Sequence, residues 1–131
     1  MDISQDFIKG IIEHALREDP NECCGILAGE VGVVSELFEM TNTAQSPYRY
    51  EMDGKELLKI LLMLDERHWD LMAIYHSHTH SPAYPSATDI RLATWPEANY
   101  ILVSLEDKSA PVVRSFRITD GGVSEEPLNS Y

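Results

Sequence analysis

The spacing of apolar residues in the first forty positions predicts a helix followed by a β-hairpin. Residues 4–18 repeat apolar side chains on one helical face, and the only histidine there, His14, is expected on the polar face. The short apolar run 23–28 predicts a buried strand. Residues 31–40 are the expected partner strand of a hairpin, with Gly29–Glu30 in the turn.

The middle of the chain predicts a surface loop and a second helix. Residues 40–50 show no stable hydrophobic period, so we expect a loop on the surface. Loops on a rigid scaffold often contact ligands, although tyrosines in such a loop can equally well cover the edge of a sheet. Residues 53–68 begin with an Asp-x-x-Glu capping pattern and are apolar on nearly every side, which predicts a buried helix. The loop residues that could contact a substrate are Asn42, Tyr48 and Tyr50.

The rest of the chain alternates apolar runs of strand length with one short helix. The expected elements are a strand at 71–76, a helix at 87–94, strands at 100–104 and 112–118, and a short strand near Val123. The whole order, α-β-β-α-β-α-β-β-β, predicts an α/β (α+β) fold in which a mixed central β-sheet is flanked by about three helices. At 131 residues, the chain is expected to form a single domain over 1–131.

Charge and composition exclude several classes of partner. The net charge of −12 argues against binding to nucleic acid or to an anionic membrane, because both need an excess of Lys and Arg. No apolar run has the length of a transmembrane helix, and the first residues do not resemble a signal peptide, so we expect a cytoplasmic location. The only cysteines, the adjacent Cys23 and Cys24, predict reduced core residues. A protein partner with a basic face is compatible with this charge. The oligomeric state, including a homodimer, stays open on the sequence alone.

Two histidines at the end of the 71–76 strand have the spacing of metal ligands. Because side chains alternate along a strand, His76 and His78 lie on the same face, roughly 7 Å apart at Cα. Downstream, Ser86-x-x-Asp89 predicts a helix start that holds a carboxylate in its first turn. Two imidazoles and one carboxylate, with a fourth position left open, are the ligand set of a catalytic zinc site. We therefore expect about one zinc ion per chain.

Each half of this pattern also has a purely structural explanation. Ser86-x-x-Asp89 by itself is a capping box, and a His-x-His pair at a strand end is often no more than a polar edge. Capping and metal binding are compatible, since a cap determines where Asp89 points, and the joint occurrence of the four residues favours the metal site. Hydrolysis would also need a group that transfers protons. Glu22, which directly precedes a buried strand, is the candidate.

Together these residues resemble the signature of the JAMM (MPN+) metallopeptidases. That signature is a Glu upstream of His-x-His, followed after seven residues by Ser-x-x-Asp. Here the Glu is Glu22, in the family-like context of residues 20–29, and residues 79–85 form the seven-residue spacer. The resemblance covers almost the whole chain. It implies a JAMM/MPN deaminase-like fold and the hydrolysis of amide bonds at the tails of ubiquitin-like proteins.

The resemblance also implies a role for each residue of the signature. His76, His78 and Asp89 would bind the zinc ion. Glu22 would act as the general acid and base, and Ser86 would hydrogen-bond the oxyanion of the tetrahedral intermediate.

Within this family, the chain is similar to bacterial peptidases that remove a C-terminal cysteine from a ubiquitin-like sulfur-carrier protein. This likeness implies a substrate with a Gly-Gly-Cys tail and the release of free cysteine for cysteine biosynthesis. Thr79 stands where many bacterial relatives have proline, and His80 lies outside the signature and is expected to be a loop residue. The chain is too short for the large insertions of eukaryotic deubiquitinases. The segments that carry the likeness are 40–42, 46–47, 74–79, 83–86, 100–104, 114–118 and 125–127.

Three other functions stay open on the sequence alone. The first is a JAMM peptidase that acts on another ubiquitin-like protein precursor or isopeptide conjugate. The second is a metal-free MPN scaffold, although such scaffolds typically lack signature residues that are all present here. The third is a zinc deaminase, which would need a Pro-Cys-x-x-Cys pattern that the adjacent Cys23 and Cys24 do not supply.

Overall fold

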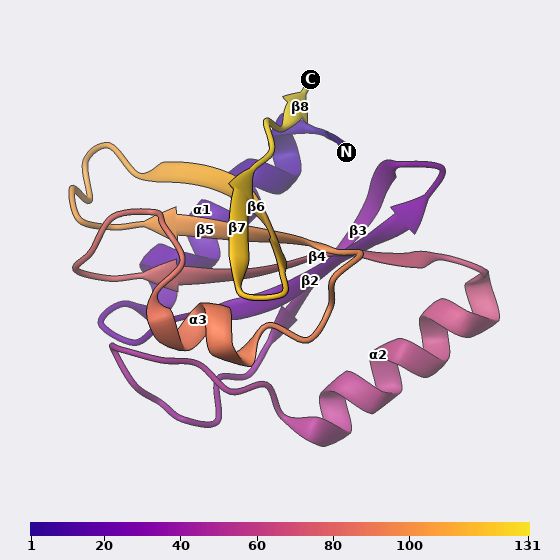
Figure 1. The fold of residues 1–131 in the computed structure, drawn as a ribbon, viewed down its shortest axis with the longest axis horizontal. Helices are drawn as coiled ribbons and strands as arrows, with labels where there is room; N and C mark the ends of the chain where they lie inside the picture. The colour runs from indigo at the N-terminus through magenta and orange to yellow at the C-terminus, as the bar shows by residue number, and fades with distance from the viewer.

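A curled eight-stranded sheet forms the centre of the computed structural model, which describes residues 1–131 (Figure 1). The helices are α1 (Gln5–Glu18), α2 (Gly54–Arg67) and α3 (Ala87–Leu92). The strands are β1 (Asp2–Ile3), β2 (Cys24–Glu30), β3 (Val33–Met40), β4 (Asp70–His78), β5 (Asn99–Ser104), β6 (Val112–Thr119), β7 (Gly122–Glu125) and β8 (Asn129–Ser130). The expected mixed sheet with three helices is confirmed.

Strand β4 lies in the middle of the sheet, whose order is β7-β6-β5-β4-β2-β3-β1-β8. It pairs antiparallel with β2 and parallel with β5. Because β2 runs in the opposite direction, the residues just before β2 lie beside the C-terminal end of β4. His76 of β4 pairs with Cys24 on one side and with Leu102 on the other. The C-terminal half of β4 is therefore held by hydrogen bonds along both edges.

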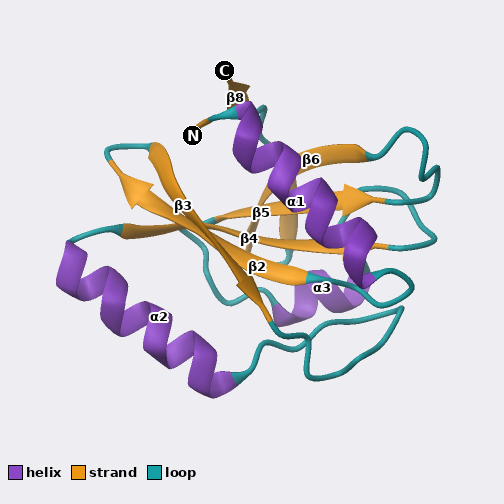
Figure 2. Cartoon of the chain, turned by 180° about the vertical axis from the view of Figure 1, so that it is seen from behind, coloured by secondary structure: helices purple, strands orange, loops and turns teal.

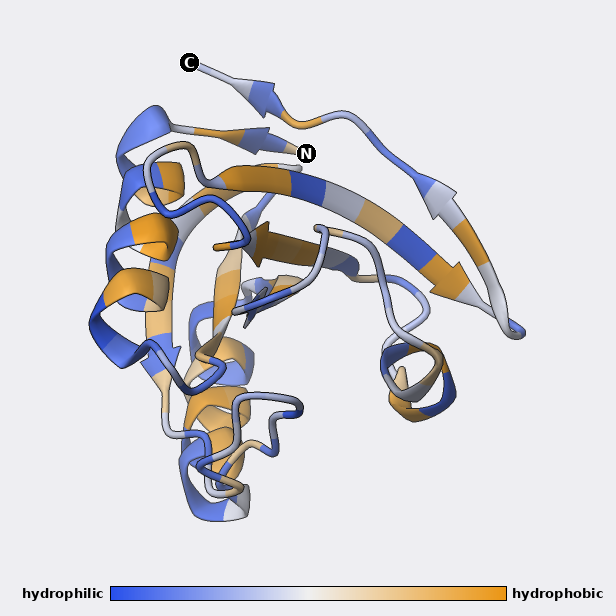
Figure 3. Ribbon diagram, turned by 90° about the vertical axis from the view of Figure 1, so that its left-hand side faces the viewer, coloured by the Kyte–Doolittle hydropathy of each residue, from blue (hydrophilic) through white to orange (hydrophobic).

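The helices divide between the two faces of the sheet. Helix α1 covers one face, where Ile11 and Ala15 pack against Leu27 and Tyr75. Figure 3 shows the apolar side of α1 turned toward the strands. Helices α2 and α3 cover the other face, and Figure 2 shows α1 in front of the sheet with α3 behind it. Ile60 of α2 belongs to the core on that second face.

His14 of α1 is buried, so the expectation of a polar-face histidine is wrong. Its side chain is 2% exposed, and its Nδ1 lies 2.6 Å from the Tyr75 hydroxyl. The Tyr75 ring reaches His14 across Gly25, where a Cβ would overlap the ring. Burial lowers the pKa of His14, and the neutral imidazole can accept the hydrogen of the tyrosine. The partner lies 61 residues away, so the pattern of α1 alone could not reveal it.

Helix α2 is buried on one side only, which corrects the expectation of a helix buried all round. Ile60 and Leu64 are its buried residues, whereas Leu58 and Leu62 are 58% and 62% exposed. Ile60 and Leu64 pack with Ile26 of β2, and the other side of the helix faces away from the strands (Figure 1). Its N-terminus is capped as expected, because the side chain of Asp53 accepts a hydrogen bond from the Lys55 backbone N–H.

The β2–β3 turn lies two residues later than expected. Strand β2 continues through Glu30, and the turn is Val31–Gly32, with φ values of 54° and 75°. Two successive residues with positive φ form a hairpin turn whose twist matches that of the flanking strands. Gly29 instead lies inside β2 at a β-bulge. The short terminal strands β1 and β8 were not predicted, because two residues are too few to show alternation.

Two further expectations concern the thiols and the helices. Cys23 and Cys24 are buried free thiols, as the sequence predicts. None of the helices combines the length and the apolar composition that crossing a membrane requires.

Candidate metal centre and active site

The C-terminal end of β4 places two imidazoles on one face of the sheet. His76 and His78 are separated by one residue, so both point to the face that carries α3. Both residues are buried, at 1% and 5% exposure. Ser77 points to the opposite face, where its hydroxyl accepts a hydrogen bond of 2.8 Å from the Cys23 backbone N–H. This contact ties the end of β4 to the segment that precedes β2.

The start of α3 brings a carboxylate to these imidazoles. Ser86 is the N-cap, and its hydroxyl oxygen accepts a hydrogen bond of 3.0 Å from the Asp89 backbone N–H. In return, Asp89 Oδ2 accepts one of 2.9 Å from the Ser86 backbone N–H. The predicted capping box is therefore confirmed. The same Oδ2 atom lies 3.1 Å from His76 Nε2 and 3.0 Å from His78 Nε2.

These three atoms have the arrangement of metal ligands. The two Nε2 atoms are 3.3 Å apart, so all three separations lie between 3.0 and 3.3 Å. A tetrahedral zinc site with bonds of about 2.0–2.1 Å separates its ligand atoms by about 3.3 Å. His76, His78 and Asp89 therefore fit three corners of one tetrahedron and could hold a metal ion. No fourth metal-ligating side chain of the protein joins this group.

Contacts outside the triad orient both rings. His78 Nδ1 donates a hydrogen bond of 2.9 Å to the Pro82 carbonyl, which leaves the lone pair of Nε2 toward Asp89. A neutral imidazole in this tautomer is the form that binds metals. The ring of His76 stacks on Tyr50, with ring centres 4.5 Å apart and an angle of 28° between the planes. Burial lowers the pKa of His76, which also favours its neutral form.

Glu22 lies beside the triad, two residues before the start of β2. Since Cys24 pairs with His76, the antiparallel register places Glu22 next to His78. Glu22 is 5% exposed, and its Oε1 has no hydrogen-bond partner in the protein. Burial raises the pKa of Glu22 to about 8. This carboxyl group can therefore gain and lose a proton near neutral pH.

Two cavities flank the triad. One, of about 300 Å³, is lined by three of the predicted site residues, Glu22, His78 and Ser86, and by neighbouring loop residues. The other, of about 240 Å³, is lined by Asp89 and by mainly apolar side chains that include Trp95. The triad thus lies between a cavity that contains the acid/base candidate and a more apolar cavity. A substrate chain that spans both would pass over the ligand atoms.

The three loop residues expected as possible substrate contacts occupy different positions in the structure. Asn42 organises its own loop, because its side chain donates to the backbone carbonyls of Glu22 and Arg49 at 3.0 and 3.1 Å. Tyr50 stacks on His76, as described above. Tyr48 is 81% exposed and lines the cavity next to Glu22. The sequence could not predict that the backbone carbonyl of Pro82 orients His78, because every residue type carries a backbone carbonyl.

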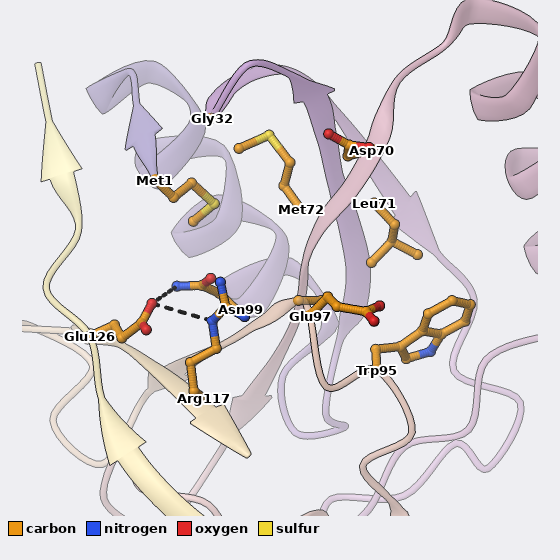
Figure 4. A pocket seen from close by; sticks show the side chains of 11 residues that line it. Met1, Gly32, Asp70, Leu71, Met72, Trp95, Glu97, Asn99, Arg117 and Glu126 are labelled. Carbon is orange, nitrogen blue, oxygen red and sulfur yellow. Dashed lines mark hydrogen bonds and ion pairs between the residues drawn. The ribbon is translucent and has the colours of Figure 1, made fainter. Parts of the chain in front are cut away.

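A larger cavity lies at the opposite end of β4 and contains none of the predicted site residues (Figure 4). Its volume is about 630 Å³, and Met72 of β4 is part of its wall. Asn99 Nδ2 and Arg117 Nε both donate to Glu126 Oε2, at 3.3 and 3.4 Å. These polar groups satisfy one another within the protein. The candidate chemistry therefore belongs to the C-terminal end of β4.

Replacing Ser86 with alanine is expected to lower both stability and turnover. Loss of the cap that accepts the Asp89 N–H should cost about 1 kcal/mol of unfolding free energy. The hydroxyl hydrogen of Ser86 has no acceptor in the protein and lies at the cavity next to Glu22. If this hydroxyl binds an oxyanion, its removal should lower kcat on the order of a hundredfold. Urea unfolding and kcat on one preparation measure both effects. Reduced stability with unchanged kcat would leave Ser86 with the capping role alone.

Comparison with known proteins gives a consistent family assignment. The family described as prokaryotic homologues of the JAB domain matches residues 4–119. The CysO-cysteine peptidase of Mycobacterium tuberculosis is 43% identical over 129 residues, which cover 97% of this chain and 88% of that protein. The desampylase of Haloferax volcanii is 33% identical, over 79% of this chain and 80% of that protein. A probable TtuB-protein conjugate cleaving protease of Thermus thermophilus is 36% identical, over 86% and 75%.

Solved structures share the fold. The solution structure of a protein from Desulfitobacterium hafniense has a TM-score of 0.88 and 34% identity, and the match covers 99% of this chain and 92% of that one. A JAB1/MPN domain protein from Archaeoglobus fulgidus has a TM-score of 0.66 at 22% identity, covering 99% and 98%. A structure described as a JAMM metalloprotease-like zinc site has a TM-score of 0.59 at 20% identity, covering 100% and 97%. The chain therefore belongs to the family of prokaryotic JAB-domain homologues and has the JAB1/MPN fold.

Proposed function

We propose that this chain is a zinc-dependent peptidase of the JAMM type that removes a C-terminal cysteine from a ubiquitin-like sulfur-carrier protein. The observation that supports the proposal is that three candidate ligand atoms lie next to the buried carboxyl group of Glu22. His76, His78 and Asp89 would hold one zinc ion per chain. The name of the mycobacterial relative, a CysO-cysteine peptidase that is 43% identical, supports this substrate.

Glu22 would carry the protons of the reaction. A zinc ion held by the triad would supply a Lewis acid that polarises the scissile carbonyl and activates water. Glu22 accepts a proton from the attacking water, since it is the one carboxyl group that lines the cavity of about 300 Å³. It then donates that proton to the leaving nitrogen as the amide C–N bond breaks. Because burial raises the pKa of Glu22 to about 8, both transfers are feasible near neutral pH.

Ser86 would stabilise the negative charge that develops on the scissile carbonyl oxygen. Its hydroxyl oxygen is already held by the Asp89 backbone N–H, so the direction of the side chain is set by the helix cap. The hydroxyl hydrogen is then available to a substrate oxygen. One water is consumed, and the products are the carrier with a terminal glycine carboxylate and free cysteine.

We also propose the compartment in which the enzyme acts and the use of the cysteine that it releases. The buried free thiols of Cys23 and Cys24 suit a reducing compartment, and we place the enzyme in the cytoplasm. The cysteine that it releases would supply cysteine biosynthesis. The partner is a small carrier protein whose flexible tail ends in Gly-Gly-Cys.

A second candidate function is cleavage of precursors or isopeptide conjugates of another ubiquitin-like protein. The names of the Haloferax desampylase and of the Thermus TtuB-protein conjugate cleaving protease favour it. The chemistry of Glu22 and the triad would be the same, and only the leaving group would differ. A metal-free scaffold is disfavoured, because such a protein has no need for a complete ligand triad beside a buried carboxyl group.

Direct comparison of two substrates tests the proposal. The first is a carrier that ends in Gly-Gly-Cys, and the second is the same carrier joined through its terminal glycine to a lysine side chain. We expect the zinc-loaded protein to cleave the first with a kcat/KM about tenfold higher or more. Faster cleavage of the lysine-linked form would favour the second candidate function. Cleavage of neither, by folded protein that contains zinc, would contradict both.

A further inference from the structure

The cavity on the Glu22 side of the triad has the dimensions of a site for a small ligand. Its volume of about 300 Å³ lies at the lower end of the range for ligand cavities. Three parts of the chain meet there: Glu22, the Pro47–Tyr48 segment, and the loop that follows β4. A side chain at the rim of this cavity can therefore contact the part of the substrate that lies next to Glu22.

The chemistry of the reaction determines which half of the substrate occupies this cavity. Hydrolysis divides the substrate into an acyl half, which keeps the carrier, and an amine half, which leaves. The acid that protonates the leaving nitrogen must be within hydrogen-bond reach of it. Glu22 lines this cavity and is absent from the apolar cavity next to Asp89. The amine half therefore lies on the Glu22 side, and the tail of the carrier lies on the apolar side.

His80 is held at this cavity by hydrogen bonds. The Thr79 hydroxyl lies 2.8 Å from His80 Nδ1 and 3.1 Å from the Pro47 carbonyl oxygen, and Thr79 is 2% exposed. The Thr79 hydroxyl has one hydrogen, and when it donates this hydrogen to His80 Nδ1, the N–H of the ring is on Nε2. Nε2 has no partner in the protein. His80 therefore offers one ring nitrogen to a ligand from an anchored position.

The other residues of the cavity offer no second nitrogen donor for a carboxylate, and its remaining donors are the hydroxyl groups of residues such as Tyr48. None of the eight lining residues is Lys or Arg. The two ring nitrogens of His78 already contact the Pro82 carbonyl and the Asp89 carboxylate. Glu22, the only acid there, would repel an anion when it is ionised. Among the side chains of this cavity, His80 is thus the nitrogen donor that a carboxylate would meet.

From this arrangement we infer that the cavity is the subsite for the leaving residue and that His80 binds the free α-carboxylate of that residue. The inference rests on the proposed peptidase function and specifies its substrate class. Only the last residue of a chain carries a free α-carboxylate beside the scissile amide. The contact would favour removal of one terminal amino acid over cleavage within a chain or at a lysine side chain.

The test compares two forms of one carrier, which ends in Gly-Gly-Cys with either a free C-terminal carboxylate or a C-terminal amide. The wild-type protein should prefer the free acid by about tenfold or more in kcat/KM, the size expected for one hydrogen bond to a charged group. In His80→Ala, the KM for the acid should rise by a similar factor with little change in kcat. The amide form should be cleaved by this variant as by the wild type.

The conservative variant His80→Gln and a stability measurement separate recognition from a structural role. Gln keeps an N–H donor, so it should restore part of the preference for the acid. His80 is exposed, so neither variant should change the unfolding temperature. Equal cleavage of acid and amide by the wild type, or equal slowing of both in His80→Ala, would overturn this inference and leave the peptidase function intact. Cleavage of neither form by zinc-loaded wild type would overturn the peptidase function, and this inference with it.

Discussion

Replacing Glu22 with glutamine should lower kcat by about 10²–10⁴-fold while leaving zinc binding unchanged. Glutamine has nearly the same shape, but it accepts no proton from water and gives none to the leaving nitrogen. Glu22 is not among the three ligand atoms, so the protein should still bind one zinc ion per chain. The release of cysteine and the zinc content, both measured on the same preparation, report the two effects separately.

Glu18→Gln is the matched control for this variant. The side chain of Glu18 is 50% exposed and does not line the cavity that Glu22 shares with His78. The same chemical change at this position should leave kcat at the wild-type value. Wild-type turnover in Glu22→Gln would assign the proton transfer to a different group.

The stability of the metal-free protein gives a second measure of the Glu22 environment. Burial raises the pKa of Glu22 from 4.5 to about 8, so the folded state binds this proton more tightly than the unfolded state. The resulting stabilisation is complete below pH 4.5 and is lost as the pH rises through about 8. Relative to the wild type, Glu22→Gln should therefore gain stability between pH 5 and pH 9. A difference in unfolding free energy that does not change with pH would contradict a buried, protonated carboxyl group.

Replacing a predicted zinc ligand should have the second largest effect, which is a loss of zinc affinity and of the turnover that depends on it. Metal-free wild-type protein should take up one zinc ion per chain. In His78→Ala the affinity should fall by more than about a hundredfold, because loss of a group that merely supports a ligand already costs 10- to 100-fold. Turnover at limiting zinc should fall with it. Titration against a competing chelator measures the affinity.

His80→Ala is the control for zinc binding, because His80 lies outside the triad. It should bind zinc as the wild type does. Equal zinc affinity in His78→Ala and the wild type would contradict the proposed ligand set.

The parts of the fold that follow from local pattern were predictable from the sequence. Helix α1 was expected at 4–18 and spans Gln5–Glu18, because its apolar period and its end at Pro20 are local features. The errors concern contacts with distant partners. His14 is buried because Tyr75 of β4 reaches it across Gly25. Similarly, the sheet covers only one face of α2, and no local pattern of leucines shows which face that is.

The ligand triad was also predictable, because local features of the sequence position its three residues. Strand alternation alone brings His76 and His78 to one face, and the capping box alone directs Asp89. The supporting contacts were not predictable, because they depend on how separate loops meet. The stacking of Tyr50 on His76 is one example. The anchoring of His80 by a buried threonine hydroxyl is another.

The zinc-loaded chain should hydrolyse the amide bond that precedes a terminal cysteine. The decisive measurement is the intact mass of a Gly-Gly-Cys carrier after incubation with this protein in ¹⁸O-labelled water. We expect the carrier to lose one cysteine residue and to gain one ¹⁸O atom in its new terminal carboxylate. A chelator should block this change, and added zinc should restore it. An unchanged carrier mass, with folded protein that contains one zinc ion per chain, would contradict the proposed cysteine-releasing activity.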